Sequence, residues 1–110
     1  MKKLLLVVGL VVSHSGLASS VDPTKITQVL VGPNYGKNVI LTVSNKPTNA
    51  PSCQTNANYS YVFDGTTEVG KMTLSVVLAA YAAQKDVWLG GTDTCTLYGG
   101  IENLKHIVAK

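Results

Sequence analysis

Residues 67–84 read Thr-Glu-Val-Gly-Lys-Met-Thr-Leu-Ser-Val-Val-Leu-Ala-Ala-Tyr-Ala-Ala-Gln, and their apolar residues recur every three or four positions. This period predicts an amphipathic helix. One apolar stripe consists of Val69, Met72, Val76, Ala80 and Ala83. An adjacent stripe consists of Leu74, Val77, Leu78 and Tyr81. A helix that is apolar on more than one face is usually buried on more than one face.

The remaining strip of this helix is small and nearly uncharged, and it consists of Lys71, Ser75, Ala79 and Ala82. A domain of this size rarely covers a helix completely by itself. The strip therefore indicates an oligomer interface, where the helix packs against its own copies or against a partner. An ordinary core helix with a small-residue solvent face explains the same pattern, and the sequence leaves both interpretations open.

Segments typical of β-strands lie on both sides of the helix. Before it come 26–31, 38–43 and 59–63, which are rich in β-branched and aromatic residues. After it come 86–97 and 101–108. Five strands with a helix between the third and fourth is the order of the OB fold, a small Greek-key barrel. We expect a mainly β domain of this type; the alternative is an α+β single sheet with one packed helix.

The amino-terminal residues 1–18 have the features of a secretory signal peptide. Lys2 and Lys3 precede an apolar run at 4–12, and Gly16 and Ala18 are the small residues expected before a cleavage site. The run is shorter than the ~20 residues that span a bilayer. We expect cleavage after Ala18, one domain at 19–110, no membrane span, and a secreted or periplasmic location.

The charge of the chain argues against nucleic acid as a partner. Removal of Lys2 and Lys3 leaves seven lysines against six acidic residues, a net charge of +1, and the chain has no arginine. Nucleic-acid binding depends on many basic contacts to phosphate groups, which this composition does not supply. Bidentate arginine clamps on phosphate or carboxylate groups are likewise excluded.

Cys53 and Cys95 are the two cysteines of the chain. In an exported protein two cysteines most simply form one disulfide. Such a bridge would anchor the polar loop at 44–57 to the strand expected after the helix. We expect no metal site, because His106 is the one further soft ligand in the mature chain.

The residues best suited to hold a ligand lie beside the expected turns. Carbohydrate sites combine an aromatic ring with hydroxyl and amide groups. The candidates are Asn34, Tyr35, Thr92, Thr94 and Tyr98. The alternative is that the aromatic residues only pack inside the domain.

Catalytic chemistry has little support in the sequence. The aspartates at 22, 64, 86 and 93 lie next to expected turns, where Asp is common for backbone reasons. His106 has no accompanying nucleophile motif such as Gly-x-Ser-x-Gly. We therefore expect no enzyme and no cofactor.

The second half of the chain resembles a family of small exported bacterial proteins. The resemblance lies in Gly70-Lys71-Met72, Leu78 to Ala83, Val87-Trp88, Gly91-Thr92 and Thr94-Cys95. These segments are similar to the B subunits of AB5 toxins of the subtilase cytotoxin and typhoid toxin type. The resemblance implies an OB fold, a ring-shaped homopentamer with helices around a central channel, a toxin A chain as partner, and binding of cell-surface glycans that are often sialylated.

The chain also departs from this family. The toxin subunits are longer, and part of their sugar site is a segment with Tyr and Ser near the first strand, where this chain has Ser20-Val21-Asp22-Pro23-Thr24-Lys25. No binding residue is carried over for this reason. The alternative function is a periplasmic protein-binding or inhibitor module, with no toxin role, that uses the loop 44–57.

Overall fold

The computed structural model describes residues 18–110, and this part of the chain is mainly β. Six strands are present: β1 (Ser20–Thr24), β2 (Ile26–Leu30), β3 (Asn38–Val43), β4 (Tyr61–Asp64), β5 (Val87–Gly91) and β6 (Leu104–Ala109). The helix α1 (Glu68–Ala83) lies between β4 and β5, and a short 3-10 helix (Pro33–Tyr35) follows β2. The signal peptide expected at 1–18 lies outside the described residues, apart from Ala18.

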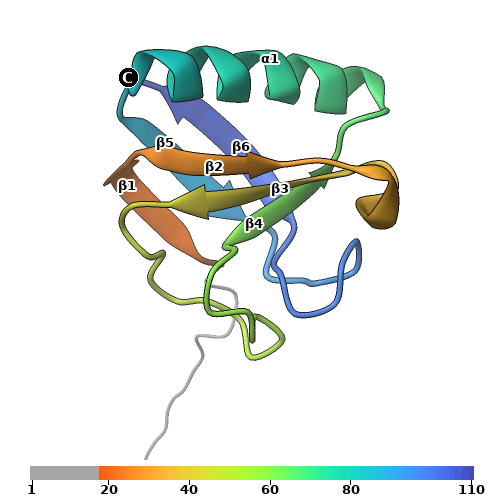
Figure 1. Ribbon diagram of the computed structural model, residues 1–110. Helices are drawn as coiled ribbons and strands as arrows, with labels where there is room; N and C mark the ends of the chain where they lie inside the picture. Colours follow the sequence, from red (N-terminus) through yellow and green to blue (C-terminus); the bar gives the residue numbers. More distant parts are fainter. Residues whose placement is uncertain (1–17) are drawn as a thin grey trace, which may run out of the picture.

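The strands form two antiparallel three-stranded sheets, in the orders β1-β5-β6 and β2-β3-β4. The single sheet of the α+β alternative is therefore wrong. Within residues 18–110 no continuous ladder closes the two sheets into one barrel; a single parallel bridge joins Val62 to Asn103. Figure 1 shows α1 across one end of the strands and the long loops at the opposite end.

The structure has one strand more than the five expected, because β1 lies before the first expected strand. Asp22-Pro23 lies within it as a cis peptide, and proline removes a backbone donor, so the sequence argued against a strand here. Antiparallel pairing of Ser20 with Gly90 and Thr24 with Val87 places β1 on the free side of β5. Only Lys25 separates β1 from β2.

The expected strand at 86–97 is also wrong beyond Gly91. Asp93 has a φ of 71°, a left-handed conformation that interrupts an extended strand. Leu97, Thr94 and Thr96 instead form hydrogen bonds with the Asn103 side chain. These bonds replace the backbone pairing that a neighbouring strand would provide. For the same reason the last strand begins at Leu104 and not at residue 101.

The helix predicted at 67–84 is confirmed, since α1 covers Glu68–Ala83. Thr67 is its N-cap and accepts a hydrogen bond from the Gly70 backbone N–H at 2.8 Å. A left-handed Gln84 ends it. Gly70, Val77 and Ala80 are buried against the strands. The helix packs on β2 and β6, so its buried face is a strip between the two sheets.

The main hydrophobic core lies beneath α1, between the sheets. Its largest members include Tyr61, Leu41, Leu89 and Ile26, each at most 1% exposed. A second, smaller cluster of Ile40, Val62 and Ile101 lies toward the loops. The core thus supports both the helix end and the loop end of the molecule.

Candidate functional site

One disulfide joins the two long loops at the end of the molecule opposite α1. Cys53 and Cys95 are bonded, as the sequence predicts, with their Cα atoms 6.0 Å apart. Backbone N–H groups of Thr55 and Asn56 both donate to the Gly100 carbonyl at 3.0 Å. The loops 44–60 and 92–103 therefore behave as one connected surface, and the disulfide is compatible with an extracellular location.

Asn103 organises the loop 92–103. Its side-chain oxygen accepts the Leu97 N–H at 3.2 Å, and its amide donates to the hydroxyls of Thr94 and Thr96 at 3.2 and 2.7 Å. Its backbone carbonyl accepts the Thr92 N–H at 3.0 Å. Because these bonds commit both ends of the amide, Asn103 shapes the loop and has little capacity left for a ligand.

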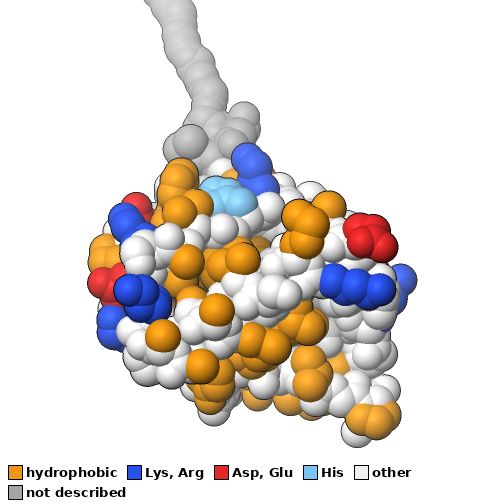
Figure 2. All heavy atoms as spheres, turned by 90° about the horizontal axis from the view of Figure 1, so that it is seen from above, with side chains coloured by type: hydrophobic (Ala, Val, Ile, Leu, Met, Phe, Trp, Pro, Cys, Tyr) orange, Lys and Arg blue, Asp and Glu red, His pale blue; other side chains and the backbone are white. Residues whose placement is uncertain are grey.

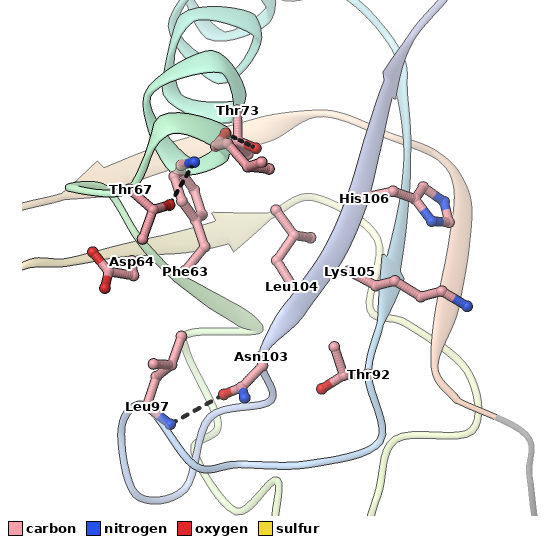
Figure 3. A pocket seen from close by; sticks show the side chains of 12 residues that line it. Phe63, Asp64, Thr67, Thr73, Thr92, Leu97, Asn103, Leu104, Lys105 and His106 are labelled. Atoms are coloured by element: carbon pink, nitrogen blue, oxygen red, sulfur yellow. Dashed lines mark hydrogen bonds between the residues drawn. The ribbon is translucent and has the colours of Figure 1, made fainter.

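A hollow of about 260 Å³ lies between the first turn of α1, the end of β4, the start of β6 and the loop that Asn103 holds. Its apolar surface comes from Phe63, Val69, Leu97 and Leu104. Its polar surface comes from Asp64, Thr67, Thr73, Thr92, Asn103, Lys105 and His106. In Figure 3, Leu104 points toward Phe63, while Lys105 points away from it. An apolar floor with a few hydroxyl and cationic groups fits a polar organic ligand.

The five ligand candidates fall into two groups. The hydroxyls of Thr92 and Thr94 are 2.7 Å apart, and Thr92 lines the hollow. The rings of Tyr35 and Tyr98 pack with their centroids 6.0 Å apart, and Asn34 lies exposed beside Tyr35. Thr92, Thr94 and Tyr98 lie in the same loop, 92–103. Leu97 of this loop is held to β3, because its carbonyl accepts a hydrogen bond from the Asn38 side chain.

Both tyrosines are half-buried and pack on the cluster of Ile40, Val62 and Ile101. The packing role that the sequence offered as an alternative is therefore part of their environment. Both rings keep part of their surface exposed, so the pair also forms an aromatic surface beside the loops.

Charged side chains near the site are paired on the surface. Asp64 lies 3.4 Å from the Lys37 ammonium. The hydroxyl and backbone N–H of Thr66 donate to Asp64, and these bonds, together with Lys37, lower the pKa of its carboxyl. Asp64 is thus held in its ionised form by local bonds typical of a turn before a helix.

The exposed face of α1 carries several large hydrophobic side chains. Val69, Met72, Val76, Leu78 and Tyr81 are between 36% and 68% exposed. The residues expected at an oligomer interface, Lys71, Ser75, Ala79 and Ala82, are exposed as well. Figure 2, which looks onto α1, shows hydrophobic side chains across the middle of this face and charged side chains at its edges.

Sequence reasoning missed two residues that organise the loop end. Asn103 was not singled out, although it makes more loop contacts than any candidate. Glu102 was not singled out either, and it is 1% exposed. An amide or acid in a β-rich segment carries no local signal of burial, because these partners meet it only when the loop 92–103 has folded and, for Glu102, when Ser19 lies beside it.

No helix in the described residues is long and apolar enough to cross a membrane. Among residues 18–110, no three His, Cys, Asp or Glu side chains come together in a way that could hold a metal ion. Comparisons of the chain with protein-family models, with curated proteins and with solved structures found no match.

Proposed function

We propose that this chain is the binding subunit of an exported homo-oligomer, a ring-shaped homopentamer that binds cell-surface glycans in the manner of AB5 toxin B subunits. The observation that carries the proposal is the apolar face of α1, on which Lys71 is the one charged residue of the strip Lys71, Ser75, Ala79 and Ala82. From Met72 to Gln84 the helix has no charged residue. The partners of this face are further copies of the same chain.

Symmetry is the reason that a second copy fits this face. Copies arranged around an axis bring the same residues of neighbouring helices together. Charged residues there would repel their own copies, whereas Ser75, Ala79 and Ala82 allow close approach without repulsion. Exposed Met72 and Val76 then supply apolar area to bury.

The arrangement of the strands supports an OB-type barrel as the protomer. β1 leads into β2, which lies at the edge of the second sheet, and β4 reaches the start of β6 through the Val62–Asn103 bridge. Joined at these two points, the strands follow the order of an OB barrel, with β1 and β2 together as its first strand. The helix then closes one end of the barrel.

Native mass spectrometry of the oxidised, processed protein tests the assembly. We expect a mass five times that of the protomer. Met72→Glu places a charge on the α1 face and should dissociate the ring, because each copy would bring its own negative charge to the contact. Val31→Glu is the matched control, since Val31 is 60% exposed and lies outside α1. A stable monomer at micromolar concentration would contradict the proposal.

The hollow is the glycan site that we propose, because its hydroxyls and Lys105 surround an apolar floor. An array of sialylated and neutral oligosaccharides tests it. Thr92→Val keeps the side-chain shape and removes a hydroxyl, so we expect it to weaken binding about tenfold. Thr27→Val, on exposed β2, is the control and should bind as the wild type does. Unchanged glycan binding by Thr92→Val would contradict a site in the hollow. Tyr98→Ala would then test the aromatic surface of Tyr35 and Tyr98.

A second candidate is a protein-binding module that uses the loop 44–60. The loop is held by many local bonds, including two from backbone N–H groups to the Asn56 side chain at 2.8 Å. It also has a small hollow of about 80 Å³ beside Pro47 and Gln54. A rigid, exposed loop is typical of inhibitors. A monomeric state together with no glycan binding would favour this candidate.

A further inference from the structure

Glu102 is a buried acid, and its hydrogen-bond partners among residues 18–110 are all uncharged. Its side chain accepts hydrogen bonds from the Ser19 hydroxyl and, at 2.8 Å, from the Asp93 backbone N–H. The ion pairs of residues 18–110 involve Asp22, Asp64 and Asp86, not Glu102. A carboxylate that is removed from water without a cation beside it destabilises the folded state. A cation beside Glu102 would therefore stabilise its buried carboxylate.

Ser19 is the residue closest to supplying that charge. It is 2% exposed, its hydroxyl lies 2.6 Å from the Tyr61 hydroxyl, and its carbonyl accepts the Gly91 N–H at 3.0 Å. By covalent geometry the α-nitrogen of a serine lies within about 3–4 Å of its own hydroxyl oxygen. Because that hydroxyl donates to Glu102, the α-nitrogen belongs to a residue whose side chain is already held against the carboxylate.

The structure also holds Ser20, the residue after Ser19, in place. Ser20 pairs with both Gly90 and Thr48, and its hydroxyl accepts the Trp88 indole N–H at 3.1 Å. Cleavage after Ser20 would remove the Ser19 hydroxyl from Glu102 and Tyr61. Cleavage before Ala18 would leave the new charge at least one residue away from Glu102. The position expected from the sequence, after Ala18, is the one that leaves Ser19 first.

We propose that Glu102 is a built-in acceptor for the new amino terminus, so that removal of the leader completes the fold. A leader peptidase hydrolyses the Ala18–Ser19 peptide bond with one water molecule. The C–N bond breaks, Ala18 becomes a carboxylate, and the Ser19 nitrogen becomes an ammonium that pairs with Glu102. The uncleaved chain has at the same position an uncharged amide.

Gly91 makes the space that this pair requires. A Cβ atom at position 91 would lie 2.1 Å from one Glu102 carboxylate oxygen and 2.7 Å from the other. The absence of a side chain thus lets the carboxylate lie directly against β5. Asp93 follows two residues later with the backbone N–H that holds the carboxylate's second oxygen.

The first test identifies the amino terminus of the exported protein by terminal sequencing and intact mass. We expect Ser19 as the first residue. A terminus at Ser20 or beyond, or one that keeps Ala18, would overturn the proposal. This result does not depend on oligomeric state or on glycan binding, so it is independent of the proposed function.

The second test measures the pairing itself. Selective acetylation of the α-amine removes its charge, and urea unfolding then compares acetylated with free protein. We expect acetylation to lower the folding equilibrium constant about tenfold or more in the wild type and to have little effect in Glu102→Gln. Asp22→Asn is the control, because Asp22 is exposed and pairs with Lys110 at 2.8 Å. Equal effects of acetylation in wild type and Glu102→Gln would contradict the pairing.

A third measurement covers the case in which Glu102→Gln does not fold. The rate at which the α-amine of the folded wild type reacts with an acylating reagent is compared with that of the same chain carrying an added Gly-Ser before Ser19. The pairing predicts at least about tenfold slower reaction for the native terminus. Equal rates would show that the terminus is free in solution and would overturn the proposal.

Discussion

The two adjacent glycines of β5, Gly90 and Gly91, each leave space for a different side chain. A Cβ at Gly90 would lie 2.4 Å from the His106 ring, and a Cβ at Gly91 would lie 2.1 Å from Glu102. The strand register shifts between these two glycines. A flexible glycine pair in the sequence is therefore, in the folded protein, a close approach of backbone to two side chains.

Gly91→Ala should lower the free energy of unfolding by about 2–3 kcal/mol, because the methyl group displaces a buried carboxylate from its hydrogen bonds. Urea denaturation of the purified variant measures this. Gly99→Ala is the control, since nothing lies within 4 Å of a Cβ there. An equal stability for both variants would show that Glu102 moves aside without cost.

Tyr61 links stability to alkaline pH. Burial raises the pKa of its phenol from 10.0 to about 12, and the nearby Glu102 carboxylate acts in the same direction. Because the folded state favours the neutral phenol, its contribution is complete below pH 10 and is lost as the pH rises from 10.0 toward about 12. The free energy of unfolding measured over this range should fall. Tyr61→Phe should remove that part of the decline, whereas Tyr81→Phe on exposed α1 should keep it.

At the residue scale the sequence predicted the bonded cysteines and the candidates near the loops. It could not predict that Tyr35 meets Tyr98, because that contact joins residues far apart in the chain. The roles of Asn103 and Glu102 have the same origin. Each depends on partners brought together only when the loops fold, as with Ser19 and Glu102.

The elements with strong local signals were predictable. The strand at 38–43 is β3 with the same bounds, and the helix differs by one residue at each end. The threonines of 92–97 have high β-propensity, yet the left-handed Asp93 and the Asn103 side chain divert this segment from a strand. The sequence did not predict β1, because Pro23 disfavours a strand locally and the pairing with β5 that forms β1 is long-range.

The amino-terminal end of α1 depends on one side chain. Thr67→Ala removes the cap bond to Gly70 and should lower the free energy of unfolding by about 1 kcal/mol. Thr73→Ala is a matched change inside the same helix, where the hydroxyl bonds only to the Val69 carbonyl of its own turn. It should be close to neutral, because alanine favours the helix. Thermal unfolding of both variants gives the comparison.

The disulfide restrains the two loops 44–60 and 92–103. It closes a separation of 42 residues, and loop entropy predicts a stabilisation of about 3–4 kcal/mol. Replacement of both cysteines by alanine should lower the free energy of unfolding by up to that amount. The loops should then exchange amide hydrogens faster than α1 does. Hydrogen exchange that stays slow in 44–60 would show that the local bonds suffice without the bridge.

In the described part of the molecule, α1 with its exposed apolar side chains lies at one end, and the loops joined by Cys53–Cys95 lie at the opposite end (Figure 1). If copies assemble through α1, folding and association are coupled. The midpoint of thermal unfolding should then rise with protein concentration in the wild type and become independent of it in Met72→Glu. A midpoint independent of concentration in both proteins would show that the α1 face stays open to water.

Trp88 is the only tryptophan of the chain. Its indole donates to Ser20, and its ring meets the His106 ring edge-on with centroids 4.6 Å apart. Its fluorescence therefore reports on whether the amino-terminal strand lies against β5. The molecule carries its own optical probe, at the place where the arrival of a newly exposed chain end could be followed in real time without any added label.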